Sequence, residues 1–311
     1  MKPIITTCYV NPDLDGFACA IAYAEFLNKT DRPSYPGLFG NLQEEIQFIL
    51  KKFNFEFSNH KPEQDSPIVL VDASELNALG KSIKPESVIE IIDHRKANDV
   101  QSFPNAKVQI EFVGSASSLI AEKFKEKNIE PSQMSAILLS AAIISNTLNF
   151  KSSTKTEKDE QMFAWLTPFA NLPNDFAHEM FAAKSDLSGN KLRQHLEDEY
   201  AWRTEKNGER SGVGQLEIIG SEKLVAKKKE EIFQILDDIA KKNDINYSFL
   251  SIIDLETDHN IFLSKDKKIM DILEHVLDIK FENNIARRPG LIMRKEIMPL
   301  FRKELEKNEN N

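Results

Sequence analysis

The feature that most constrains the fold is a series of short apolar runs in the first part of the chain, separated by segments with helical spacing. The runs cover residues 3–10, 67–71, 88–92 and 108–112. Each is short and rich in β-branched residues, which predicts a buried strand. In the segments between them apolar residues recur at helical spacing, as at Phe17, Ala20 and Ala24. Strands that alternate with helices are typical of a mostly parallel α/β sheet.

A break in this pattern near residues 183–191 predicts a domain boundary. We expect a larger α/β domain at residues 1–184, with helices on both faces of its mostly parallel sheet. A linker at residues 185–190 and a smaller α/β domain at residues 191–311 are expected to follow. The length of 311 residues is sufficient for two domains. In the second domain the pattern predicts strands at 212–219, 248–253 and 260–263 and a helix at 267–277. The charged tail from residue 303 onward is expected to fray.

Aspartates follow directly on three of the predicted strands. Asp13 and Asp15 come after the first, Asp72 after the second, and Asp93 with His94 after the third. Ligands of open α/β sheets bind at the carboxyl ends of the strands, so these side chains are expected in one crevice. For a single aspartate, a turn or a helix N-cap is the simpler interpretation. The series as a whole favours a site for a hard divalent ion such as Mg or Mn, because clustered carboxylates repel one another without a cation.

The charge balance excludes one class of partner. The chain has 40 Lys plus Arg against 49 Asp plus Glu, a net charge of −9. A broad nucleic-acid-binding surface would be basic, so long nucleic acid is not an expected partner. A small anionic substrate remains compatible, since a metal or a local Lys/Arg cluster can reverse the potential inside a cleft.

The sequence also predicts a cytoplasmic protein that does not enter a membrane. The longest apolar stretches, such as residues 136–144, are far shorter than the roughly 20 residues of a membrane-spanning helix. The first apolar run leads straight into Asp13 and Asp15, which a secretory segment would not tolerate. Cys8 and Cys19 lie in apolar surroundings and are expected to be buried thiols. A homodimer is left open.

Several short motifs, in order and spacing, resemble those of the DHH phosphoesterase superfamily. They are Asn11-Pro12-Asp13-Leu14-Asp15, Val71-Asp72, Asp93-His94-Arg95, Val113-Gly114-Ser115 and the segment 138–152. Near the end, residues 290–295 resemble a Ser-Arg-Lys-Lys substrate-binding motif. Together these motifs resemble the branch that contains the manganese-dependent (family II) inorganic pyrophosphatases and related exopolyphosphatases. The resemblance covers nearly the whole chain.

This resemblance implies a metal-dependent hydrolase of phosphoanhydride bonds, acting on pyrophosphate or short polyphosphate, with its active site between two domains. It implies two ions, Mn or Mg, near which Asp72, His94 and Arg95 would be catalytic. Asp13 and Asp72 would hold one ion, and Asp15, Asp72 and His94 the other. Asp93 would orient His94 without binding metal, and Asn146 falls at the position of a further ligand.

The resemblance also implies substrate contacts from both domains. The backbone N–H groups of Gly114 and Ser115 precede a predicted helix, where an anion can bind. Lys191, Arg294 and Lys295 would reach phosphate oxygens from the second domain.

Three positions depart from the family pattern. Tyr9 stands where the family has a histidine, and neutral tyrosine is a poor ligand for Mn or Mg. Asn146 replaces an aspartate and removes a charge, which for unit charges near 4 Å corresponds to about 4 kcal/mol at an effective dielectric constant near 20. Arg95 replaces the second histidine of the DHH motif and could bind phosphate oxygens. Exopolyphosphatase-like members share the first and last departures.

Two other functions stay open. The superfamily also includes nucleases, so the chain could be a phosphodiesterase acting on small nucleotides. Because Tyr9 and Asn146 each remove part of the metal site, it could instead be a catalytically weak sensor that binds metal or phosphate.

Overall fold

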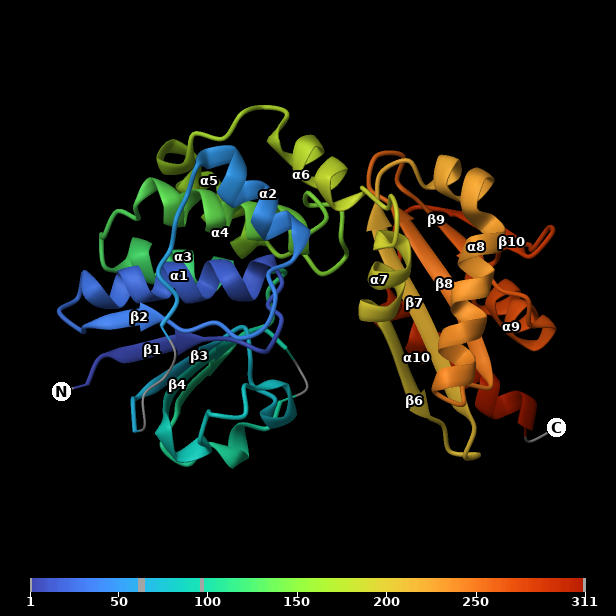
Figure 1. Ribbon diagram of the computed structural model, residues 1–311, viewed down its shortest axis with the longest axis horizontal. Helices are drawn as coiled ribbons and strands as arrows, with labels where there is room; N and C mark the ends of the chain where they lie inside the picture. The colour runs from blue at the N-terminus through green and yellow to red at the C-terminus, as the bar shows by residue number, and fades with distance from the viewer. Residues whose placement is uncertain (1, 61–64, 96–97, 310–311) are drawn as a thin grey trace. The chain divides into compact units, whose positions relative to one another are not determined.

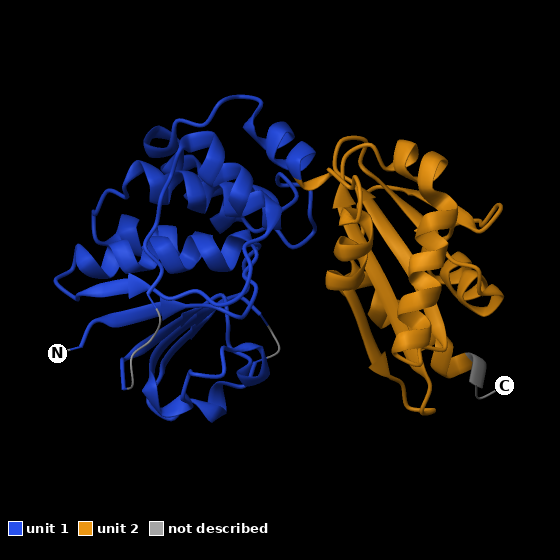
Figure 2. Cartoon of the chain, viewed as in Figure 1, with its two compact units in different colours: residues 1–183 blue, residues 184–311 orange. Residues whose placement is uncertain are grey.

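The computed structural model of the chain describes residues 2–60, 65–95 and 98–309. The chain forms two compact units, which we call unit 1 (Met1–Ala183) and unit 2 (Lys184–Asn311) and which Figure 2 shows in different colours. Each unit contains a five-stranded sheet. Among the described residues, no helix is long and apolar enough to cross a membrane. Cys8 and Cys19 are buried free thiols, as expected.

The sheet of unit 1 is parallel, with strand order β2-β1-β3-β4-β5 (Figure 1). Its strands are β1 (Ile4–Thr7), β2 (Ser34–Pro36), β3 (Ile68–Val71), β4 (Val88–Asp93) and β5 (Lys107–Ile110). Thr7 of β1 pairs with Leu70 of β3, and the next residue of β3, Val71, pairs with Ile92 of β4. The carboxyl ends of the three central strands are therefore level, which brings the residues that follow them to one edge of the sheet.

Helices flank this sheet, and those labelled in Figure 1 all lie on one side of it, whereas the sequence predicted helices on both faces. They are α1 (Leu14–Asn28), α2 (Glu44–Phe53), α3 (Ala116–Glu126), α4 (Gln133–Asn146), α5 (Glu157–Ala170) and α6 (Phe176–Lys184). Helix α4 is buried on all sides from Ser135 to Ser145, which explains its nearly uniform apolar sequence. The connections from β3 to β4 and from β4 to β5 contain short 3₁₀ turns, η1 (Leu76–Ala78), η2 (Pro85–Ser87) and η3 (Val100–Ser102), and, among their described residues, no α-helix.

Unit 2 has a mixed sheet in the order β10-β9-β8-β7-β6. The strands are β6 (Tyr200–Thr204), β7 (Arg210–Ile218), β8 (Tyr247–Asp254), β9 (His259–Leu263) and β10 (Ile285–Pro289). Strands β7 and β8 pair in parallel, and the other neighbours pair antiparallel. The helices are α7 (Lys191–Asp198), α8 (Ser221–Lys242), α9 (Lys267–Leu277) and α10 (Arg294–Glu309).

Alternate residues of β8 face two separate hydrophobic cores of unit 2. Leu250 and Ile252 pack with residues of α7 and α8, whereas Phe249 packs with residues of α9 and α10. This alternation is the expected consequence of the two-residue period of a strand. The expectation that the tail frays from residue 303 onward is wrong, because α10 continues to Glu309 and buries Phe301 and Leu305.

Candidate metal centre

Asp15 is a buried carboxylate in the first turn of α1, held by donors from two other helices. The turn is set by Asp13, whose side chain caps α1 by accepting the Gly16 N–H at 2.9 Å. The Asp15 carboxylate accepts hydrogen bonds from the Ala116 and Ser117 N–H groups and from both serine hydroxyls of the pair Ser115 and Ser117, at 2.6–2.9 Å. These donors, at the N-terminus of α3, offset the cost of burying the charge.

Asp72 follows β3 and is fully buried. Its backbone has a φ of +51°, a left-handed conformation that is uncommon for a residue other than glycine and that recurs at functional sites. Its Oδ2 lies 3.4 Å from Arg95 Nη2, and Arg95 Nη1 donates to its backbone oxygen at 2.8 Å. Its Oδ1 has no hydrogen-bond partner among the described residues. An unpartnered buried carboxylate oxygen is costly, so this atom marks a place for a cation.

His94 presents one ring nitrogen to this oxygen. Its Nδ1 lies 2.8 Å from the backbone oxygen of Val113, which can only accept, so Nδ1 carries the proton. Nε2 lies 3.3 Å from Asp72 Oδ1 and 4.0 Å from Asp15 Oδ2. In the neutral ring this nitrogen is an available metal ligand.

Asp93 supports the backbone around His94. Its carboxylate accepts the N–H groups of His94 at 2.7 Å and of Arg95 at 3.3 Å, and also the hydroxyl of Ser74. The ring itself is oriented by Val113. Asp93 was expected to orient His94. It fixes the backbone turn that carries His94 and does not contact the ring.

The ligand atoms of Asp15, Asp72 and His94 all lie within 4.8 Å of one another. Burial raises the pKa of Asp72, with Arg95 opposing and Asp15 adding to the rise. Burial alone would lower the pKa of His94, but its contact with Asp72 and the charges of Asp72 and Asp15 outweigh that effect and raise it. Two carboxylates and one imidazole, with the unpartnered Oδ1 of Asp72 among their ligand atoms, fit a divalent ion such as Mn or Mg.

Tyr9 and Arg95 lie on the other side of Asp72. The Tyr9 hydroxyl accepts the Asp13 N–H at 3.2 Å, and the Arg95 guanidinium lies 4.9 Å from the centre of the Tyr9 ring. Burial and the charges of Asp13 and Asp72 raise the pKa of Tyr9 well above its usual value, so the phenol stays protonated. Tyr9 therefore packs against a cation instead of offering a ligand oxygen.

The backbone of Gly114 and Ser115 is already occupied by a protein carboxylate. Their N–H groups donate to Asp159 at 2.8 and 3.2 Å, and the Ser118 hydroxyl donates to the same buried side chain at 2.6 Å. The expectation that these N–H groups are open to a substrate anion is therefore corrected. Sequence reasoning missed Asp159, although Thr156 and Asp159 form a capping box, whose spacing is visible in the sequence.

Asn146, at the end of α4, was expected to offer an oxygen to the metal. Instead its Nδ2 donates to Asp15 Oδ2 at 2.7 Å. Because an ionised carboxylate can only accept, this assignment of the amide is the one that chemistry requires. Asn146 thus adds a donor to Asp15 where a charged ligand would add repulsion.

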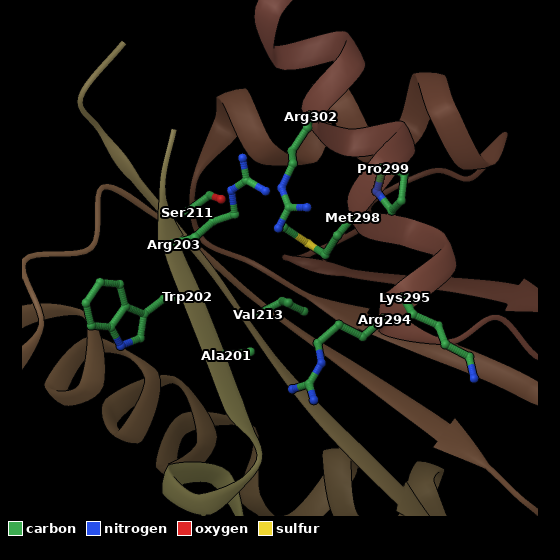
Figure 3. Close-up of a pocket in the computed structure, with 10 residues that line it drawn as sticks. All are labelled: Ala201, Trp202, Arg203, Ser211, Val213, Arg294, Lys295, Met298, Pro299 and Arg302. Carbon is green, nitrogen blue, oxygen red and sulfur yellow. The ribbon is translucent and has the colours of Figure 1, made fainter. Parts of the chain in front are cut away.

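In unit 2 the proposed substrate residues lie at the starts of two helices. Lys191 begins α7 and forms an ion pair with Asp186 at 2.7 Å. Arg294 begins α10, where its N–H donates to Gln215 at 2.6 Å, and Lys295 follows it and is exposed. Arg294 and Lys295 line a pocket of about 280 Å³ that also contains Arg203 and Arg302, two residues that sequence reasoning missed (Figure 3).

Comparisons with known proteins agree with this architecture. A family model described as the DHH family N-terminal domain matches residues 3–144, and one described as the DHHA2 domain matches residues 178–303. A Methanocaldococcus jannaschii protein named manganese-dependent inorganic pyrophosphatase is 30% identical over 307 residues, which cover 94% of this chain and 96% of that protein. The chain belongs to the DHH family, in the branch of the family II inorganic pyrophosphatases.

Other family II relatives cover the chain equally fully. A Clostridium acetobutylicum protein named as a probable manganese-dependent inorganic pyrophosphatase is 28% identical over 97% of this chain and 98% of its own length. A crystal structure of a Methanococcus jannaschii protein assigned to the family II inorganic pyrophosphatases has a TM-score of 0.76 at 28% identity, covering 97% of this chain and 99% of that one. The resemblance that the motifs indicated is confirmed.

Proposed function

We propose that this family II chain is a metal-dependent phosphohydrolase that releases orthophosphate from pyrophosphate or short polyphosphate. The observation that carries the proposal is the group Asp15, Asp72 and His94, with its buried, unpartnered Oδ1. The names of its full-length relatives support the same reaction.

Asp15, Asp72 and His94 would hold one divalent ion, Mn or Mg. When bound there, such an ion activates a water molecule and polarises a phosphoryl oxygen. The chain's own contribution is to fix the ligands in place: donors from α3 and α4 hold Asp15, and Val113 holds His94 with Nε2 free of its proton. Arg95 has further N–H groups that we propose contact a phosphate oxygen.

The resemblance implies a second ion, held by Asp13 and Asp72. Such an ion would compete with Arg95, whose guanidinium already lies 3.4 Å from Asp72 Oδ2. We therefore propose that the site formed by Asp15, Asp72 and His94 is the tighter of the two. Titration of the metal-free protein with Mn, followed by calorimetry, counts the ions directly.

The test of the reaction is phosphate release from pyrophosphate and from tripolyphosphate, each with Mn and with Mg. We expect release by the wild type and a large loss in Asp72→Asn, which keeps the size of the buried side chain but removes its charge. Asp31→Asn, at an exposed position, is the matched control. Absence of release from both substrates, or full activity of Asp72→Asn, would contradict the proposal.

A second candidate is a sensor that binds metal or phosphate without turnover. The observation that favours it is the hydrogen bond from Asn146 to Asp15, which replaces an acidic ligand by a neutral donor. One bound Mn with no phosphate release under any substrate condition would favour the sensor over the enzyme.

A further inference from the structure

Asp159 is a buried carboxylate that the proposed metal site does not include. It lies in the first turn of α5 and is fully buried. Its Oδ1 accepts the Ser115 N–H at 3.2 Å and the Ser118 hydroxyl at 2.6 Å. Its Oδ2 accepts the Gly114 N–H at 2.8 Å and, from Thr156, the N–H at 2.7 Å and the hydroxyl at 2.8 Å. Backbone N–H groups can only donate, so the side chain is an acceptor at both oxygens, as the ionised form is.

One peptide group joins Asp159 to His94. The Val113 carbonyl and the Gly114 N–H belong to the same planar peptide unit. The N–H of this unit donates to Asp159 Oδ2 at 2.8 Å, and its carbonyl oxygen accepts the proton of His94 Nδ1, also at 2.8 Å. At the far side of the ring, Nε2 lies 3.3 Å from Asp72 Oδ1, among the ligand atoms of the metal site. The contacts therefore form one continuous chain from Asp159 through the peptide and the imidazole to the metal site.

The glycine at position 114 lets the carboxylate reach this peptide. A Cβ atom added at Gly114 would lie 2.8 Å from Asp159 Oδ2 and 2.8 Å from Thr147 Cγ2, which is closer than Cβ atoms approach other atoms in proteins. Both neighbours are fully buried, so neither can move aside at little cost. The glycine that was expected to open the backbone to a substrate anion thus makes room for a protein carboxylate.

Helix capping explains only part of this arrangement. Thr156 and Asp159 form a capping box at the start of α5, which accounts for the two bonds from Thr156. It does not account for the bond from Gly114, which is 45 positions away in the sequence. A capping side chain needs no contact with the peptide that holds a metal ligand, so this contact calls for a separate explanation.

A negative charge at one end of such a chain strengthens the hydrogen bond at the other end. Hydrogen bonds in series polarise one another, so a carboxylate that accepts the N–H of a peptide makes the carbonyl oxygen of that peptide a better acceptor. A better acceptor at Nδ1 fixes the orientation of the ring and raises the basicity of Nε2, which improves the imidazole as a metal ligand.

We propose that Asp159 is a positioning residue of the metal centre, which acts on His94 through the Val113–Gly114 peptide and thereby raises the affinity of the site for a divalent ion. The proposal rests on the proposed function, because it takes His94 as a metal ligand. Asp159 itself touches neither the ion nor the substrate. It sets the orientation and the basicity of a residue that binds the ion.

A double-mutant cycle on Mn affinity separates this effect from a general loss of structure. We expect Asp159→Asn to lower the Mn affinity of the full-length protein by about tenfold or more, as measured by calorimetric titration. In the His94→Gln background the same substitution should lower it by less than about threefold, because the imidazole that transmits the effect is absent. An equal loss in both backgrounds would overturn the proposal, since Asp159 would then act through the start of α3 alone.

Leu166→Ala, in the same helix, is the matched control. The side chain of Leu166 is fully buried, so its truncation leaves a cavity and should lower the unfolding temperature. It leaves the hydrogen bonds of Asp159 in place, and the Mn affinity should stay that of the wild type. A loss of Mn affinity as large as that of Asp159→Asn would contradict the proposal, because the affinity would then follow the stability of α5.

Proton NMR of the metal-free protein in EDTA observes the chain of hydrogen bonds directly. The Nδ1 proton of His94 is identified as the downfield resonance that His94→Gln lacks. Asp159→Asn should move this resonance upfield, because the bond to the Val113 oxygen weakens, and Leu166→Ala should leave it in place. An unchanged resonance in Asp159→Asn would overturn the proposal. Neither readout involves phosphate release, so absence of hydrolysis would refute the proposed reaction without deciding the role of Asp159, which these two measurements decide.

Discussion

The amide nitrogen of Asn146 lies 2.7 Å from Oδ2 of Asp15, although the two residues are 131 positions apart in the sequence. A neutral donor therefore stabilises the charge of Asp15 at the position where the resemblance implies a second carboxylate. Changing this contact should therefore affect the stability of the metal-free protein and the affinity for metal in opposite directions.

Replacing Asn146 by aspartate should have opposite effects in the two states. Without metal, Asn146→Asp places a second charge against Asp15 and should lower the unfolding temperature. With Mn bound, the added carboxylate is a ligand, so the affinity for Mn should rise by roughly tenfold or more, as a conversion of about 1.4 kcal/mol implies. Calorimetric titration and thermal unfolding in EDTA and in Mn measure both effects. Equal unfolding temperatures in EDTA, or unchanged affinity, would refute this account of the contact.

Arg95 should compete with metal for Asp72. In Arg95→Gln, the buried Asp72 Oδ2 loses a cationic partner that is itself 33% exposed. We therefore expect a cost between the roughly 1 kcal/mol of an exposed ion pair and the roughly 3–5 kcal/mol of a buried one. We expect a lower free energy of unfolding in EDTA but tighter Mn binding than in the wild type. Arg32→Gln, which breaks a long, partly exposed ion pair with Glu90 at 3.8 Å, should change stability by less than about 1 kcal/mol. Weaker Mn binding in Arg95→Gln would show that Arg95 supports the site.

Asp159 should be essential to the start of α3. In Asp159→Asn, an amide nitrogen faces donors from Gly114, Ser115, Ser118 or Thr156, which leaves buried polar groups unsatisfied. Each such group costs about 1–3 kcal/mol, so we expect a loss of at least that size in urea unfolding. Asp175→Asn, at an exposed position, is the control and should unfold as the wild type does. Mn affinity should fall as well, since the same helix start holds Asp15.

Unit 2 should lose stability between about pH 4 and pH 2 through Asp254. Burial alone would raise its pKa, but hydrogen bonds from the Ser221 N–H at 2.8 Å and the Thr257 N–H at 3.0 Å outweigh burial and lower the pKa to about 2. A depressed pKa stabilises the folded state above the unfolded pKa, by about 2 kcal/mol here, and that contribution disappears as the pH falls through the folded pKa. Wild type and Asp254→Asn should therefore differ in their free energy of unfolding at pH 7. This difference should become small at pH 2.

The control for this titration is Asp244→Asn, whose side chain is 91% exposed. It should follow the wild type at both pH values. A difference between wild type and Asp254→Asn that persists unchanged at pH 2 would contradict the assignment.

The strands that position the metal centre could be predicted because they are buried on both faces. Strands β1 and β3 consist wholly of buried residues, which leaves a continuous apolar run in the sequence. The edge strand β2 was missed because its sequence, Ser34-Tyr35-Pro36, includes a proline, which strands tolerate at an edge. Strand β6, at the edge of the other sheet, was missed because its side chains are largely exposed and leave no apolar run in the sequence.

The ligand candidates were predictable, but the contacts that modify them were not. Asp72 and His94 directly follow strands, and Asp15 lies in the first turn of the helix after β1, so the local pattern was enough to predict that the three lie together. The occupation of the Gly114 N–H by Asp159 and the sharing of Glu205 by Arg203 and Arg302 depend on segments 45 and 97 positions apart, respectively. Such pairings depend on tertiary packing and cannot be predicted from hydrophobic periodicity, which reflects only local structure.

The hydrogen bonds of Asp15 tie together α1, the start of α3 and the end of α4 without any ion. Substitution of this residue would therefore be selected against by folding alone. A lineage that gave up metal-dependent turnover would be free to change Asp72 or His94 while keeping Asp15 and Asn146. An aspartate kept at this position in a descendant sequence therefore indicates that the helices still pack together. Whether the descendant still binds metal and is active has to be judged from Asp72 and His94.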